Sequence, residues 1–199
     1  VHSGGRNVEG SYLGDFLERA SAQMSVARNA ITDDQFDRIC SMLSEPKRRI
    51  FILGGRISDT IAAHLSFHLR QARGGVYHLP LNAEVWPEYL LRMKHGDIFF
   101  VMDFRRYQPA LTELVQKASS VRGARVIVMT DKWISPAARH ATDILPVPIE
   151  SGTLWDTYSP ALAVIEAIVT KIAEDNWDQT RDRIESWDRL RFNDKDLIY

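Results

Sequence analysis

Short apolar runs alternate with amphipathic segments along most of the chain. The apolar runs predict buried strands at Ile50–Leu53, Val76–Leu79, Ile98–Met102, Val126–Met129 and Ile144–Val147. The segments between them predict helices at Ser58–Gln71, Ala83–Met93, Pro109–Val121 and Pro136–His140. Strands that alternate with helices are typical of βαβ units. We therefore expect an α/β fold, a three-layer sandwich around a five-stranded parallel sheet with the common strand order 2-1-3-4-5.

Two helices are predicted before the first strand. Residues 12–30 are amphipathic, with an apolar face made by Leu13, Phe16, Leu17, Ala20 and Met24. Thr32 and Gln35 have the spacing of a capping box, which predicts a second helix that runs to about Leu43. The first helix lies outside the α/β unit, so its apolar face predicts a partner surface, in a homodimer or a dimer of dimers.

Two more helices are predicted after the last strand. One runs from Pro160, at its first helical position, to about Asn176, and the other is rich in Arg and Asp and ends near Leu190. The chain is expected to divide into residues 1–10, a linker or expression remnant, 11–45, the N-terminal helices, and 46–199, the ligand-binding α/β domain.

The composition of the chain excludes several classes of function. With 199 residues, 45% of them hydrophobic, the chain is long enough for one domain with a sizeable core. A net charge of −1 provides no global basic field for nucleic acid or anionic membranes. No apolar run approaches the roughly 20 residues of a membrane helix. Cys40 is the only cysteine and no signal peptide is evident, so a cytoplasmic protein is expected.

The segment RIFILGGRIS joins the first strand to the next helix. Gly54 and Gly55 allow a sharp turn and a close backbone approach to a ligand, and Ser58 stands where the helix begins. The Ser58 hydroxyl is expected to cap that helix or to bind something at its positive end. A strand, a glycine turn and a helix N-terminus favour anion binding, and an ordinary tight turn is the alternative.

The loop after the third strand, DFRRYQ, carries the densest charge of any strand-end loop. With the expected strand order, it faces the glycine turn across the crevice where ligands bind in such sheets. Arg105 and Arg106 are therefore candidates to grip a phosphate or carboxylate. The alternative is that one arginine pairs with Asp103 or a surface acid and the other is solvated.

Two further loops are candidates for the rim of the site. TDKWIS, after the fourth strand, offers Thr130, Asp131 and Ser135, although Ser135 before a proline is first a helix cap. Residues 150–159 are polar, aromatic and long enough to form a lid, or a plain connection to the next helix.

His64 and His68 have a spacing that can bind zinc, but no third ligand is evident. We expect no metal site and no cofactor.

FILGGRISDTIAAHL, MTDKWISPAARHATDILPVPIES and the helix after Ser159 together resemble a SIS (sugar isomerase) domain. The resemblance is closest to the C-terminal effector domain of MurR/RpiR-type bacterial transcriptional regulators. It implies a five-stranded SIS-like α/β sandwich that dimerises and binds a phosphosugar, as an isomerase or as a sensor. By position it implies ligand binding by Gly54, Gly55 and Ser58 and by Thr130, Asp131 and Ser135.

The loop from Asp103 departs from that resemblance. Many SIS proteins have a Ser-x-Ser-Gly-x-Thr phosphate cradle there, whereas this chain has Asp103, Phe104, Arg105, Arg106 and Tyr107. An anionic ligand, a phosphosugar or a sugar acid, is then expected to be held by arginine.

The leading hypothesis is the ligand-sensing domain of an RpiR-type regulator, because sensing requires only differential binding to two states. DNA is expected as a partner only through the helix-turn-helix domain that the resemblance implies and that this chain lacks. The first alternative is a phosphosugar isomerase, which requires a base such as Glu150 near the sugar carbon. The second is an assembly domain with a vestigial pocket.

Overall fold

The computed structural model describes residues 11–191. Five parallel strands form one sheet in the order β2-β1-β3-β4-β5, so the expected α/β topology is confirmed. The strands are β1 (Ile50–Gly54), β2 (Val76–His78), β3 (Ile98–Met102), β4 (Arg125–Thr130) and β5 (Asp143–Pro146). In register, Ile50 of β1 lies beside Val76 of β2 and Ile98 of β3. The strand order reverses between β1 and β3, where the chain passes from one half of the sheet to the other.

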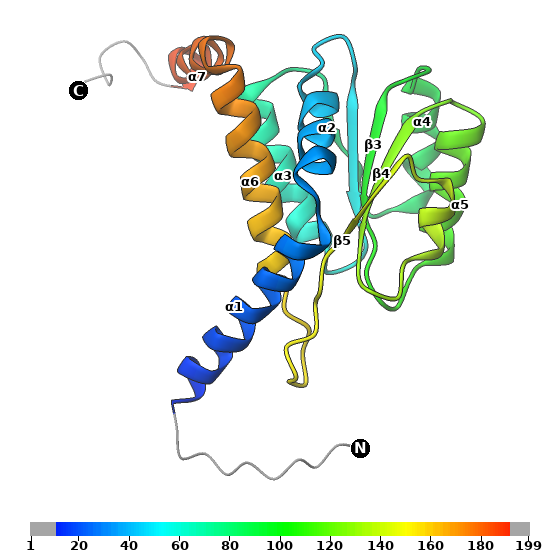
Figure 1. The fold of residues 1–199 in the computed structure, drawn as a ribbon. Coiled ribbons are helices and arrows are strands. Elements are labelled where there is room, and N and C mark those ends of the chain that lie inside the picture. The colour runs from blue at the N-terminus through cyan, green and yellow to red at the C-terminus, as the bar shows by residue number, and fades with distance from the viewer. Residues whose placement is uncertain (1–10, 192–199) are drawn as a thin grey trace.

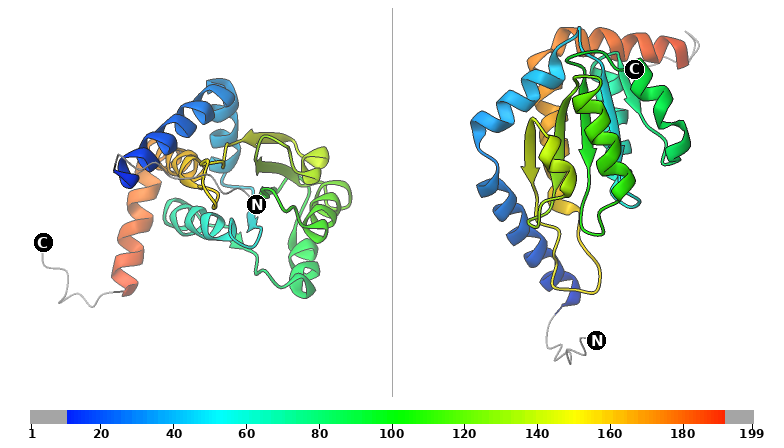
Figure 2. Two further views of the ribbon diagram at one scale, coloured as in Figure 1. Left: turned by 90° about the horizontal axis from the view of Figure 1, so that it is seen from below. Right: turned by 90° about the vertical axis from the view of Figure 1, so that its right-hand side faces the viewer.

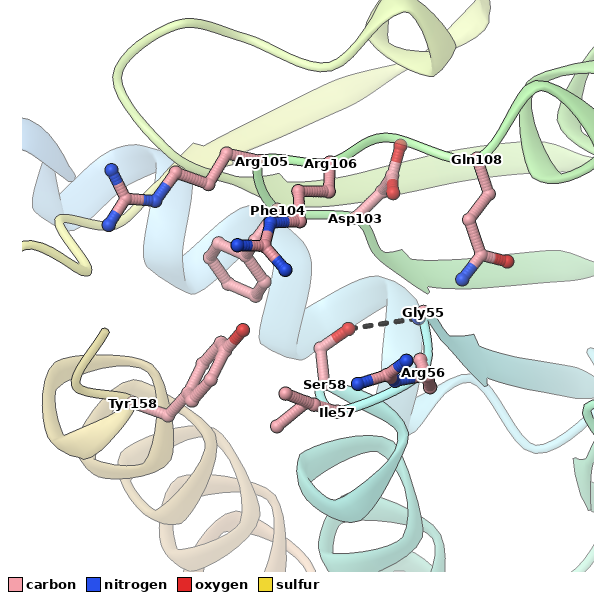
Figure 3. Close-up of a pocket in the computed structure, with 10 residues that line it drawn as sticks. All are labelled: Gly55, Arg56, Ile57, Ser58, Asp103, Phe104, Arg105, Arg106, Gln108 and Tyr158. Atoms are coloured by element: carbon pink, nitrogen blue, oxygen red, sulfur yellow. Dashed lines mark hydrogen bonds between the residues drawn. The ribbon is translucent and has the colours of Figure 1, made fainter. Parts of the chain in front are cut away.

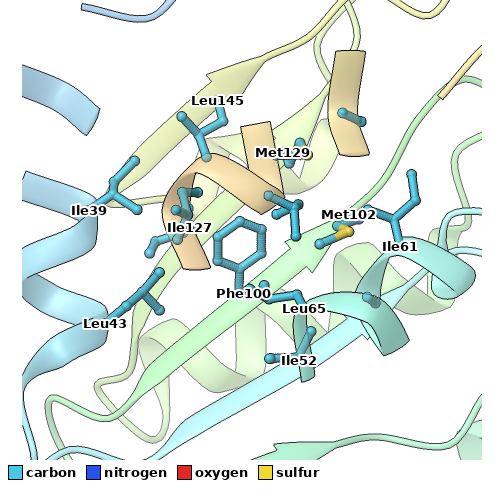
Figure 4. Close-up of a cluster of buried hydrophobic side chains, with 14 of the residues drawn as sticks. Ile39, Leu43, Ile52, Ile61, Leu65, Phe100, Met102, Ile127, Met129 and Leu145 are labelled. Atoms are coloured by element: carbon cyan, nitrogen blue, oxygen red, sulfur yellow. The ribbon is translucent and has the colours of Figure 1, made fainter. Parts of the chain in front are cut away.

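Helices cover both faces of the sheet, as Figure 1 shows. One face carries α2 (Asp33–Ser44), α3 (Asp59–Ala72) and α6 (Ser159–Asp175), and α1 (Tyr12–Ala30) contacts α6. The other carries α4 (Trp86–Arg92), α5 (Pro109–Ser120) and the 3₁₀ helix η2 (Pro136–His140). Alternate residues of each central strand point to opposite faces, so Phe100 and Phe99 enter different clusters. Figure 4 shows the first of these clusters, with Phe100 between α2, α3 and the strands.

The last helix, α7 (Trp177–Arg191), packs on α3 near the edge of the sheet where the strands begin. At the opposite edge, where the strands end, α1 and the loop before α6 extend beyond the sheet (Figures 1 and 2). We call these the amino edge and the carboxyl edge. No helix among residues 11–191 is long and apolar enough to cross a membrane.

The elements predicted from the sequence match the structure to within a few residues, with one difference. Residues 83–93 do not form one helix, because the 3₁₀ turn η1 (Ala83–Val85) precedes α4. Pro87 in the first turn of α4 has no N–H to donate to the preceding turn, so regular α-helical bonding starts late. The expected linker at residues 1–10 lies outside the described residues.

The N-terminal helices differ in how they are buried. Thr32 caps α2 by accepting from the Gln35 N–H at 3.2 Å, but the Gln35 side chain donates to the Ile144 carbonyl at 2.7 Å instead of completing a capping box. The buried residues of α2 belong to the core cluster of the sheet. On α1, by contrast, Leu13, Leu17 and Met24 of the predicted apolar face are exposed.

Candidate functional site

A cavity of about 210 Å³ opens at the carboxyl edge between β1 and β3. It lies at the point where the strand order reverses, which is where open α/β sheets bind ligands. Its walls come from the loop after β1, the loop after β3 and the start of α6, as Figure 3 shows. The lining residues are Gly55, Arg56, Ile57, Ser58, Asp103, Phe104, Arg105, Arg106, Gln108 and Tyr158.

The two glycines after β1 have different roles. A Cβ atom on Gly54 would lie 2.3 Å from the Asp59 backbone nitrogen, so only glycine lets α3 begin directly against the strand. Neither glycine has a positive φ, so the expected conformational freedom is not used. Gly55 lines the cavity, and Gly54 lies behind it.

Ser58 does not cap α3 with its side chain, contrary to that expectation. Its buried hydroxyl donates to the Met102 carbonyl at 2.8 Å and accepts from the Gly55 N–H at 2.9 Å, which ties the first loop to the end of β3. Among residues 11–191, the N–H groups of Arg56, Ile57 and Ser58 have no protein acceptor. The start of α3 therefore presents free donors and the positive end of its dipole.

The neighbouring arginines of the second loop have opposite environments. Arg105 forms an ion pair with Asp156, with Nε to Oδ2 at 2.9 Å, and its guanidinium lies over the Trp133 ring. Arg106 has no carboxylate partner among the described residues. In Figure 3 its side chain points toward Ser58, whereas Arg105 points away from the other lining residues. One arginine pairs with a surface acid, as the alternative interpretation predicted, and the other faces the cavity.

A second unpaired guanidinium belongs to Arg56, which the sequence analysis did not select. It lines the same cavity and, within the described part of the chain, contacts no carboxylate. Two guanidiniums and free N–H groups around one hollow create a positive potential with directed donors, which is what an oxyanion requires. Arg56 directly follows the two glycines in the GGRIS segment, and this position could have indicated that it belongs to the anion site.

Polar and aromatic side chains complete the walls. The Tyr158 ring meets the Phe104 ring edge to face at 5.4 Å, and its hydroxyl faces the cavity in Figure 3. Burial raises the pKa of that hydroxyl, so it remains a neutral hydrogen-bond donor. Gln108, just before α5, adds an amide. Both residues lie in loops that the sequence analysis placed at the site, Gln108 in DFRRYQ and Tyr158 in residues 150–159, although neither was named individually.

Asp103 is the one carboxylate in the lining. Its side chain is almost completely buried, and burial raises its pKa from 3.8 to about 6. The Ser135 hydroxyl donates to Asp103 Oδ2 and opposes that rise. Among the described residues Asp103 forms no ion pair with an arginine, so of the two partners that the alternative interpretation offered, it is the other acid, Asp156, that holds Arg105.

The third loop supports the site from behind. Thr130 accepts from the Ser135 N–H at 3.0 Å, and Ser135 accepts from the Ala137 N–H, so it caps η2 as its alternative interpretation predicted. Asp131 accepts from the Arg105 N–H at 2.5 Å and from the Tyr107 hydroxyl. None of Thr130, Asp131 and Ser135 lines the cavity, so their direct contact with a ligand stays a prediction.

The loop before α6 lies beside the site. Asp156 holds Arg105, and Glu150 pairs with Lys132 at 2.6 Å, which leaves Glu150 outside the cavity lining. His64 and His68 on α3 lie with their ring centroids 4.5 Å apart and their ring planes tilted by 56°. Within residues 11–191 no three His, Cys, Asp or Glu side chains gather closely enough to hold a metal ion.

Several solved structures share this fold. The RpiR transcription factor from Sphaerobacter thermophilus (sugar isomerase domain) superimposes with a TM-score of 0.81 at 16% identity, over 90% of this chain and 99% of that one. The Vibrio vulnificus NanR protein complexed with ManNAc-6P gives 0.76 at 15% identity, over 92% of this chain and 69% of that one. A phosphoheptose isomerase from Francisella tularensis gives 0.66 at 12% identity, over 81% of this chain and 96% of that one.

A sequence search finds no match among curated proteins. The family model of the SIS domain, however, matches residues 42–171, which span the sheet and the candidate site. The chain therefore belongs to the SIS domain family.

Proposed function

We propose that this chain is the effector domain of an RpiR-type transcriptional regulator that senses a sugar phosphate or a sugar acid. The observation that carries the proposal is the pair Arg56 and Arg106, both unpaired among the described residues, in one cavity at the switch point of the sheet. Similar structures include an RpiR transcription factor and a NanR protein complexed with ManNAc-6P, which supports the regulator reading.

In this proposal the anionic group of the ligand lies between Arg56, Arg106 and the N–H groups at the start of α3. Gln108 and the Tyr158 hydroxyl are the candidates to bind sugar hydroxyls. Gly54, Thr130, Asp131 and Ser135 hold the loops in position, and Arg105 acts through its ion pair with Asp156. Binding then stabilises one arrangement of the loops over another, which is sufficient for sensing.

A phosphosugar isomerase is the second candidate, because Asp103 lines the cavity with a pKa raised to about 6. A base with a pKa near the working pH is what proton transfer at a sugar carbon requires. The buried position of Asp103 and its hydrogen bond from Ser135 favour a structural role for this carboxylate over a role as the catalytic base.

Titration calorimetry with ManNAc-6P, glucose 6-phosphate and gluconate, followed by NMR of each mixture, separates the two functions. A sensor binds at least one of these probes in a saturable way and leaves it unchanged for hours. Conversion of a bound aldose to a ketose would assign an isomerase, and no binding by any anionic sugar would overturn both.

The proposal includes a homodimer or a dimer of dimers, in the cytoplasm. Leu13 and Leu17 of α1 and Leu154 and Trp155 of the loop before α6 are exposed, and both segments extend beyond the carboxyl edge in Figure 1. Apolar side chains gathered in this way favour contact with a second copy. DNA contact is assigned to a separate helix-turn-helix domain. Light scattering at micromolar concentration tests the assembly, and a monomer would contradict it.

A further inference from the structure

A second, larger hollow lies at the amino edge, on the opposite side of the molecule from the candidate site. Its volume is about 500 Å³, within the range of small-molecule sites. The walls come from the connection between α2 and β1, the turn between α3 and β2, and the side of α7 that packs on α3. In Figure 1 this is the end of the molecule where α7 lies.

Arginine dominates the charge of this hollow. Arg48, Arg49, Arg73 and Arg183 line it, against a single carboxylate, Asp182. The whole chain has a net charge of −1, so this excess of cations is local.

Three of these guanidiniums bind only carbonyl oxygens. Arg48 donates to Gly96 O at 2.5 Å, and Arg183 donates to Arg70 O at 2.6 Å in the last turn of α3. Arg73 donates to Leu43 O at 2.5 Å, to Gly74 O and to Arg48 O. Among residues 11–191, none of the three has an ion pair with a carboxylate.

Hydrogen bonds to carbonyl oxygens explain where these side chains lie, but they do not neutralise the charge of the guanidiniums. The nearby carboxylates are engaged elsewhere, Asp97 with Arg49 at 2.7 Å and Asp182 with Arg181 at 3.4 Å. Burial also lowers the pKa of the half-buried Arg73, and the charge of nearby Glu45 offsets only part of that effect. An anion bound in the hollow would lower the free-energy cost of burying this positive charge.

The turn between Arg73 and β2 adds backbone donors. Gly74 and Gly75 line the hollow, and within the described residues their N–H groups have no acceptor. A Cβ on Gly74 would lie 3.9 Å from Arg183 Nη1, so the bare backbone leaves room beside that guanidinium. Gly75 has φ of +72°, a conformation that favours glycine.

We propose that this amino-edge hollow is a second anion site, which binds a compact small molecule with at least two negative charges, of the diphosphate class. Three guanidiniums without counter-ions and free N–H groups match several phosphate oxygens at once. A long polyanion fits less well, because the four acidic and four basic side chains of α7 balance, so this helix offers no extended basic surface beyond the hollow.

Inorganic pyrophosphate is the probe, and the Arg106→Ala variant is the background, because it weakens the anion site at the carboxyl edge. In that background calorimetry should detect one saturable site. Arg183→Gln should raise its Kd at least tenfold. Arg189→Gln, on the same helix but outside the lining and paired with Glu185, should change Kd less than twofold. Arg73→Gln should also raise Kd at least tenfold in protein that retains the wild-type circular dichroism.

Two results would overturn the inference. One is no saturable pyrophosphate binding in the Arg106→Ala background, and the other is equal losses from Arg183→Gln and Arg189→Gln, which would indicate general screening. Displacement of pyrophosphate by a short DNA duplex at equal phosphate concentration would contradict the compact ligand. The proposed sugar site is tested separately by its own probes, so failure of one site leaves the other standing.

Discussion

Arg105 and Arg106 are adjacent in sequence but have different environments because of backbone geometry. Arg106 has φ of +67°, which turns its side chain to the other side of the loop from Arg105. Arg105 pairs with Asp156, and Arg106 faces the cavity. A non-glycine residue in this conformation is uncommon and indicates a position that the surroundings hold.

The buried carboxyl of Asp103 predicts a pH dependence of stability. Its pKa rises from 3.8 to about 6 on folding, so the folded state disfavours the ionised form. The free energy of unfolding should therefore fall as pH rises from 4 to above 6, by up to about 3 kcal/mol at 1.36 kcal/mol per unit. The Asp103→Asn variant has no carboxyl to ionise at this position, so its stability should not fall in this way. Relative to wild type, the variant should therefore become more stable as pH rises from 4 to above 6.

Urea unfolding at pH 4, 5, 6 and 7 measures the effect. Glu113→Gln is the control, because Lys117 lowers the pKa of that exposed carboxyl and the small effect should have the opposite sign. A constant difference between Asp103→Asn and wild type from pH 4 to pH 7 would show that Asp103 titrates normally.

The two glycines after β1 give a matched pair of substitutions. Gly54→Ala forces a Cβ to within 2.3 Å of backbone, whereas at Gly55 the nearest atom is Ser58 Oγ at 3.3 Å. We expect Gly54→Ala to lose at least about 3 kcal/mol of stability, the upper end for overpacking, and Gly55→Ala about 1 kcal/mol or less. Denaturant unfolding of both variants provides the comparison, and equal losses would refute this explanation of Gly54.

At the scale of elements, the alternation of apolar runs and helices was enough to predict the parallel sheet, and taking the common order for five such strands gave the strand order that the structure has. Buried parallel strands must be continuous and apolar, so Ile98–Met102 was predicted with its exact bounds. The cavity lining was harder to predict. Residues 150–159 were predicted as a rim or lid, but local patterns did not reveal that Asp156 would pair with Arg105, 51 residues away, or that Tyr158 would line the cavity.

The same ion pair joins the loop after β3 to the loop before α6. Asp156→Asn should therefore loosen residues 151–158 and speed their amide hydrogen exchange about two- to fivefold, as expected for a partly exposed pair worth 0.5–1 kcal/mol. Asp175→Asn breaks the exposed Lys171–Asp175 pair on α6 and should leave those amides unchanged. Unchanged exchange in Asp156→Asn would mean that the loop is held by other contacts.

At the scale of the whole molecule, the two arginine-rich hollows lie at opposite edges of one sheet. The carboxyl edge has the sugar-site candidate, α1 and the loop with Trp155, whereas the amino edge has the second hollow and α7. α3 runs between them, with its first turn at one hollow and its last turn at the other. An anion at either end of α3 would therefore act on the same helix.

The central claim is that unpaired arginines, rather than a hydroxyl cradle, hold the anion of the ligand. Calorimetry with the tightest sugar probe should show Arg106→Ala weakening binding by about 1.5–3 kcal/mol, which is about 10- to 150-fold. Arg106→Lys should restore part of the loss, since it keeps the charge without the planar fork. The exposed Arg139→Ala is the matched control and should bind as wild type.

The Arg105→Ala variant, measured in the same titration, tests which of the two adjacent arginines binds the anion. Because Arg105 is held by Asp156, its loss should cost less than fivefold in affinity, and Ser58→Ala should cost less than Arg106→Ala. Wild-type affinity in Arg106→Ala, together with lost binding in Ser58→Ala, would contradict the account.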